Sequence, residues 1–195
     1  MTGKDVLILF RVTLLLFFFF CINDVSSQTP KQVSFPQSFT GHWKGTLTWS
    51  SNGRPQQHTE MQLIIRSADT PRHYTWQIIY GRDEKDNRPY LLKPADSSGI
   101  HWVVDERNGI VLDGFWIGNR FTGAFAVGGN TILDAYWIEN NKLHVEFFSY
   151  RQQPLNTSGK GTEESPVVEN YRMNSYQKAV LTKIQHVKPK MKNIK

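Results

Sequence analysis

The sequence predicts an all-β protein, an antiparallel up-and-down barrel of about eight to ten strands. Short segments in which apolar and polar residues alternate recur along the chain, separated by turn-forming residues such as Asn52-Gly53, Asn108-Gly109 and Gly128-Gly129. No stretch between them has the 3.6-residue period of a helix. Strands that pair in sequence order leave two open edges unless the sheet closes on itself. A barrel is therefore favoured, with a face-to-face sandwich as the alternative.

The first predicted strand covers residues 41–50. Trp43, Leu47 and Trp49 occupy odd positions, whereas the even positions carry polar residues such as Lys44 and Thr46. A period of two is typical of a strand with one face inside and one face in water.

Eight further segments with high β propensity follow this strand. They cover residues 60–66, 73–80, 90–92, 100–104, 110–117, 120–127, 131–138 and 142–150.

The last part of the predicted domain is less regular. Residues 153–166 are rich in Pro, Gly and Ser, which predicts a flexible loop, and Asn156 within it fits the glycosylation acceptor pattern. Residues 167–173 are predicted to be extended, and residues 176–184 to form either a closing strand or a short helix. Residues 40–185 are thus expected to form a single barrel domain.

The N-terminus has the features of a secretory signal peptide over residues 1–27. Basic residues precede an apolar run at 12–22, which is too short to span a bilayer, and small residues follow at 25–27. Acylation of Cys21 as a lipoprotein is disfavoured, because Phe20 stands where a small residue is expected. We therefore expect a secreted or periplasmic protein.

Cleavage after residue 27 would remove the single cysteine, so no disulfide is expected in the mature chain. Residues 28–39 form a polar lead-in that contains two prolines. The formal net charge of +6 comes from lysines near the C-terminus, because residues 28–177 hold 15 basic and 15 acidic side chains. This balance argues against a nucleic-acid partner, which needs a basic face on the folded domain. Residues 186–195 are predicted to be a basic solubilising tail.

The triplet Gly41-His42-Trp43 at the start of the first strand resembles the opening of the lipocalin-like (calycin) superfamily. The strand also resembles that of small exported bacterial proteins of unassigned function that begin with Gly-x-Trp-x-Gly-x-Leu. The calycin resemblance implies that Trp43 plugs one end of the barrel and that an arginine, Arg151 or Arg172, packs over it. The Thr-Asp-Tyr-like segment and the paired cysteines of lipocalins are absent.

Six tryptophans fall on different predicted strands, and a closed barrel would bring several of them into one interior. They either line a pocket for a hydrophobic or planar ligand or fill the barrel as core. In the ligand hypothesis the lining residues are the following: Trp76, Trp102, Trp116, Trp137, Tyr136 and Asp134.

Acidic residues on the predicted strands offer a second function. Asp113, Asp134 and Glu146, together with Tyr136, would suit general acid–base chemistry if they faced the interior. Asp113 and Asp134 are solvated instead if the opposite faces of residues 110–117 and 131–138 point inward. Both faces of these two strands are apolar, so alternation supports either orientation, with the solvated one favoured.

No motif indicates a metal or a cofactor. The histidines of the predicted strands occur singly, no Gly-x-Ser-x-Gly elbow is present, and the paired glycines lie in hairpins rather than before a helix. The sequence therefore predicts an exported, non-enzymatic binder of a small hydrophobic or aromatic ligand, with no stable membrane span after signal cleavage. The alternatives are a lipocalin-like enzyme that uses interior carboxylates, and a solid-core structural or interaction module.

Overall fold

A computed structural model of the chain describes residues 34–184. The predicted signal peptide, the first half of the lead-in and the basic tail lie outside this range. The described part consists of a short 3₁₀ helix, η1, and ten strands. Their bounds are η1 Gln37–Phe39, β1 Gly41–Ser51, β2 Gln57–Ile65, β3 Tyr74–Tyr80, β4 Asp86–Pro94, β5 His101–Asp105, β6 Val111–Ile117, β7 Arg120–Val127, β8 Asn130–Glu139, β9 Lys142–Ser158 and β10 Val168–Lys183. None of the helical structure in residues 34–184 is long and apolar enough to cross a membrane.

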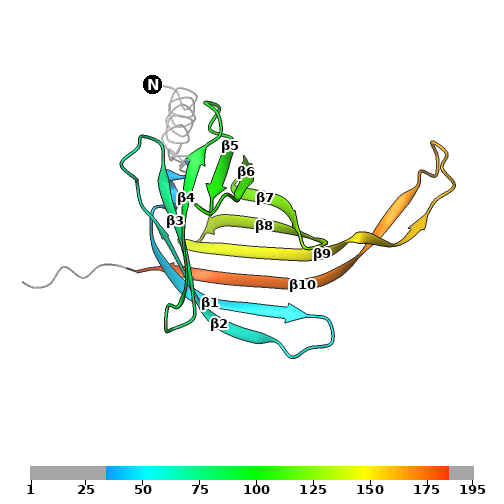
Figure 1. The fold of residues 1–195 in the computed structure, drawn as a ribbon, viewed down its shortest axis with the longest axis horizontal. Coiled ribbons are helices and arrows are strands. Elements are labelled where there is room, and N and C mark those ends of the chain that lie inside the picture. Colours follow the sequence, from blue (N-terminus) through cyan, green and yellow to red (C-terminus); the bar gives the residue numbers. More distant parts are fainter. Residues whose placement is uncertain (1–33, 185–195) are drawn as a thin grey trace, which may run out of the picture. The chain divides into compact units, whose positions relative to one another are not determined.

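The ten strands form one closed antiparallel barrel in which each strand pairs with its neighbours in sequence (Figure 1). β10 closes the sheet by pairing with β1, where Leu47 lies opposite Ala179. The predicted all-β up-and-down barrel is confirmed. Of the two forms expected for residues 176–184, the strand is the one observed, and it supplies the closing edge.

The alternation read from the first strand sets the inside of the barrel. Trp43 and Leu47 are buried, and the register places Leu63 of β2 and Leu181 of β10 on the same interior face. The two ends of the barrel then differ. The turns β2–β3, β4–β5, β6–β7 and β8–β9 lie at one end, which we call the closed end, and the remaining turns lie at the other, which we call the mouth.

The closed end is filled by one hydrophobic core. Residues 34–40, which precede β1, contribute Phe35 and Phe39 to it. Phe35 stacks on Phe121 with ring centroids 4.5 Å apart. On β6 the interior position beside Phe121 is Gly114, where an added Cβ would overlap the Phe121 ring. The core therefore depends on a glycine inside a strand as well as on large side chains.

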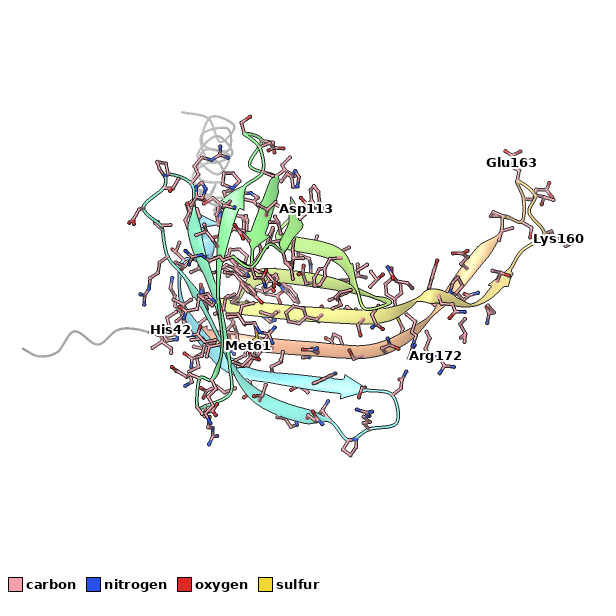
Figure 2. All side chains as sticks on the ribbon, in the orientation of Figure 1. His42, Met61, Asp113, Lys160, Glu163 and Arg172 are labelled. Carbon is pink, nitrogen blue, oxygen red and sulfur yellow. The ribbon has the colours of Figure 1, made fainter. Side chains whose placement is uncertain are left out.

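At the mouth, β9 and β10 extend past the other strands as a two-stranded arm (Figure 1). The arm narrows to a turn where Figure 2 shows Lys160 and Glu163. Strand β9 includes residues 153–158, part of the segment expected to be a loop, and β10 begins at Val168 as the extended segment 167–173 predicted. Pro154 is accommodated because the pairing of β9 with β10 is irregular in this region.

Candidate functional site

The interior of the barrel is open at the mouth. A cavity of about 1170 Å³ lies between the core and the mouth. We call it the mouth cavity. Its walls are formed by apolar, small polar and arginine side chains from several strands. The lining residues include Leu47, Trp49, Ser51, Arg54, Tyr80, Asp86, Arg88, Phe125, Val127, Ile132, Phe147, Ser149, Arg151, Leu155, Arg172, Asn174 and Ser175.

The polarity of the wall changes from floor to rim. On β1 the successive interior residues are Leu47, Trp49 and Ser51, and Leu47 is buried. On β9 they are Phe147, Ser149 and Arg151. β1 and β9 therefore each present an apolar side chain at the depth of the core and a polar or charged one nearer the mouth.

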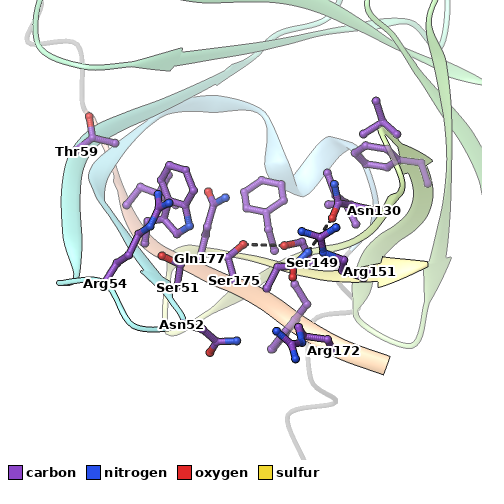
Figure 3. Close-up of a pocket in the computed structure, with 18 of the residues that line it drawn as sticks. Ser51, Asn52, Arg54, Thr59, Asn130, Ser149, Arg151, Arg172, Ser175 and Gln177 are labelled. Atoms are coloured by element: carbon purple, nitrogen blue, oxygen red, sulfur yellow. Dashed lines mark hydrogen bonds between the residues drawn. The ribbon is translucent and has the colours of Figure 1, made fainter. Parts of the chain in front are cut away.

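Small polar groups interrupt the apolar wall at mid-depth. The Ser149 and Ser175 hydroxyls hydrogen-bond each other at 2.8 Å from neighbouring strands (Figure 3). Because this pair satisfies part of its own hydrogen-bonding capacity, it can face an apolar ligand at small cost.

Two aromatic and ionic contacts fix one side of the cavity. Arg88 of β4 donates from Nε and a terminal nitrogen to both Asp86 carboxylate oxygens, at 2.8 and 2.9 Å. Its guanidinium lies 4.8 Å from the centroid of the Tyr80 ring. The Arg88 hydrogen bond lowers the pKa of Asp86, and burial raises the pKa of Tyr80 to about 12, so Tyr80 is neutral at physiological pH.

Irregular pairing between β9 and β10 shapes the rim. The register shifts around Tyr171 and Met173, so Arg172 and Asn174 lie at positions without a regular partner on β9. The Asn174 side-chain amide donates to Oδ1 of Asn130 on β8 at 2.7 Å. Bulges redirect side chains, and here the residues at the irregular positions are among those that line the cavity.

The tryptophans predicted to line a pocket lie elsewhere. Trp76 and Trp102 are buried in the core of the closed end, and Trp116 packs against that core. Trp137 faces outward from β8, where it stacks on His144 and lies beneath the Arg120 guanidinium. The tryptophan on the cavity wall is Trp49.

The predicted plug is formed partly by other residues. Trp43 is buried at the closed end, and its Nε1–H donates to the Phe39 carbonyl oxygen at 2.7 Å. The cation over its ring is Lys183, whose Nζ lies 5.2 Å from the ring centroid. Arg151 and Arg172, the arginines expected there, line the mouth cavity at the opposite end.

The four residues of the acid–base hypothesis do not gather at one place. Asp113 faces outward from β6 and pairs with His101 at 2.7 Å. Glu146 faces outward from β9 and accepts a hydrogen bond from the Tyr176 hydroxyl at 2.6 Å. Asp134 and Tyr136 do face the interior of β8, with Tyr136 in the core. The favoured prediction, in which both aspartates face solvent, is therefore correct for Asp113 on β6 and wrong for Asp134 on β8.

Asp134 is a largely buried carboxyl group, and its ionisation makes the stability of the fold depend on pH. Burial raises its pKa to about 6, and a backbone hydrogen bond from Gly123 opposes this only in part. Since the folded-state pKa exceeds the unfolded one, the protein should lose stability as pH rises between about 4 and 6. Asp134→Asn is expected to raise the free energy of unfolding by about 2–3 kcal/mol at pH 8 and to change it little at pH 4.

Urea denaturation at the two pH values measures this difference. Asp69→Asn, at an exposed position in the turn before β3, is the matched control and should have no effect at either pH. An Asp134→Asn effect that is equal at pH 4 and pH 8 would contradict burial of an ionised carboxylate.

No cluster of three or more metal-ligating side chains occurs in residues 34–184. The histidines take local partners instead. His42 contacts Gln62 at 2.7 Å, His58 contacts Thr48 at 3.2 Å, and His73 contacts the Pro71 carbonyl at 2.9 Å.

The sequence alone indicates that Trp49 faces the interior of the barrel. Trp49 shares the odd parity of Trp43 and Leu47, which places it inside the barrel. The sequence did not indicate that Arg88 lies on a strand of the barrel wall. The fourth strand was expected only over residues 90–92, whereas β4 starts at Asp86.

Comparison with known proteins gives little further guidance. No protein-family model matches the chain, and no curated protein matches it. Among solved structures, an S-type phycobiliprotein lyase, CPES, from Guillardia theta is similar over 75% of this chain and 89% of its own, with 8% sequence identity and a TM-score of 0.48. Similarity at this level concerns backbone architecture only, and the calycin resemblance stays a prediction from the opening of β1.

Proposed function

We propose that this protein is a non-enzymatic binder that holds one small, mostly apolar ligand in the mouth cavity. The predicted signal peptide makes it an exported binder. This part of the proposal rests on the sequence of residues 1–27 alone.

One observation carries the proposal: apolar side chains line a concave site that the protein itself leaves open. Trp49 is 45% exposed and Val127 is 58% exposed, although both line the cavity. Apolar surface left in contact with water in a concave site marks a ligand-binding region, since covering it contributes about 25 cal/mol per Å². The volume of about 1170 Å³ lies just above the range of roughly 300–1,000 Å³ that is usual for small-molecule sites, so one such ligand fits in it.

The neutral fluorophore N-phenyl-1-naphthylamine tests this proposal. It brightens when it enters an apolar site, so stripped and refolded protein should give a saturable one-site titration. Ser149→Trp places an indole in the cavity and should weaken the affinity at least tenfold. Val180→Trp, at an exposed position on the outer face of β10, is the matched control and should bind as the wild type does.

Two results would contradict the proposal. One is a wild-type protein that gives no saturable signal. The other is equal weakening by Ser149→Trp and Val180→Trp, which would mean that the probe binds outside the cavity or responds to altered stability. Circular dichroism of both variants checks that the fold is retained.

A further inference from the structure

The rim of the mouth cavity carries more positive than negative charge. Four arginines and one carboxylate line the cavity, and the carboxylate, Asp86, is already engaged by Arg88. Within residues 34–184 the other three arginines, Arg54, Arg151 and Arg172, make no ion pair with a carboxylate. Residues 28–177 as a whole hold equal numbers of basic and acidic side chains, so this local excess belongs to the site rather than to the folded body as a whole.

These three arginines come from separate segments. Arg54 lies in the β1–β2 turn, Arg151 on β9 and Arg172 at an irregular position of β10. Figure 3 shows all three around the cavity, with the apolar side chains of the wall between them. Like charges placed around one opening repel one another, and an anion bound there relieves that repulsion.

We infer that the ligand of the mouth cavity is a single-chain amphipathic anion, with its apolar chain toward Leu47 and Phe147 and its anionic head group at Arg151 and Arg172. This inference rests on the proposed function, because it names the chemical class of the ligand in that same cavity. The change from apolar floor to arginine rim matches such a molecule along its length. A guanidinium binds carboxylate and phosphate groups through two parallel hydrogen bonds, which suits either head group.

The test compares ligands that share one chain and differ in the head group. Dodecanoate, dodecyl phosphate and dodecan-1-ol are each used to displace N-phenyl-1-naphthylamine, at pH 8 and below their micellar concentrations. We expect at least one of the two anions to bind at least tenfold more tightly than the alcohol. The preference should shrink at high salt, because exposed charges are screened. Comparison of the two anions identifies the head group.

Arg151→Gln/Arg172→Gln should reduce this preference to about threefold or less, because it weakens binding of the preferred anion more than binding of dodecan-1-ol. Arg66→Gln/Lys142→Gln removes the same charge next to closed-end turns and serves as the control. It should retain the preference.

The outcomes separate the two proposals. If the fluorophore binds and the alcohol and both anions displace it equally, the anion inference fails and the proposed function stands. If the preference survives in Arg151→Gln/Arg172→Gln, the assignment to these arginines is overturned. If neither the fluorophore nor any dodecyl compound binds, the proposed function fails together with this inference.

Discussion

Trp76→Ala is expected to lower the free energy of unfolding by about 3–5 kcal/mol. Trp76 is only 1% exposed, and its ring makes edge contacts with Phe121 and Tyr136 at centroid distances of 5.5 and 5.0 Å. Truncation removes the transfer free energy of an indole and leaves a void among large rings. These rings are held on different strands and cannot collapse to fill the space.

Trp137→Ala is the matched control because it removes the same side chain from the other face of the barrel wall. Trp137 is 8% exposed, and it is covered by the Arg120 guanidinium at 3.9 Å and by His144 at 4.9 Å. Its loss should cost roughly 1–2 kcal/mol, since cation–π and stacking contacts on the outer face of the wall are weak and the Arg120 side chain can move into the space that is left.

Urea denaturation followed by far-ultraviolet circular dichroism measures both variants without relying on tryptophan fluorescence. Equal losses for Trp76→Ala and Trp137→Ala would mean that the outer face of β8 is as tightly packed as the interior. That result would contradict the face assignment on which the mouth cavity depends.

The alternation in β1 predicted the interior of the barrel correctly because the two faces of that strand differ sharply. Trp43 and Leu47 are inside, and Lys44 is outside in an ion pair with Glu60. On β8 the alternation of apolar and polar residues did not identify the interior face. Leu133 and Trp137 are apolar yet face outward, and Asp134 faces inward. The side chain of Arg120 covers Trp137, so the outer face of this strand can be apolar as well.

Besides the facing of β8, the sequence did not give the depth of each residue along the barrel axis. A period of two tells which face a residue occupies, and it does not tell how far along the barrel the residue lies. Trp76 and Trp102 share the interior with Trp49, yet they lie in the core, whereas Trp49 lies on the cavity wall. The strand register and the filled closed end decide this difference, and both depend on contacts between residues distant in sequence.

The alternation of apolar and polar residues also did not predict that the segment before β1 packs into the core. Removing its two phenylalanines is expected to have the second large effect on stability. Phe35→Ala/Phe39→Ala is expected to lower the free energy of unfolding by at least about 5 kcal/mol, because each buried phenylalanine contributes about 3–5 kcal/mol. Phe39 is fully buried, and Phe35 stacks on Trp116 and Phe121 at 5.1 and 4.5 Å. Such a loss equals the whole stability of many domains.

Thermal denaturation of the full chain measures this effect against Ser34→Ala/Gln37→Ala, which alters two exposed side chains of the same segment. The control should melt as the wild type does. Both double variants change side chains of the same segment, so a difference between them separates the packing of Phe35 and Phe39 from the conformation of the segment itself. If the melting temperature of Phe35→Ala/Phe39→Ala were also near that of the wild type, the barrel would be stable without these two phenylalanines in its closed end. Residues 34–40 would then be a dispensable lead-in, and the floor of the mouth cavity would have to be supported by Trp43 and the strands alone.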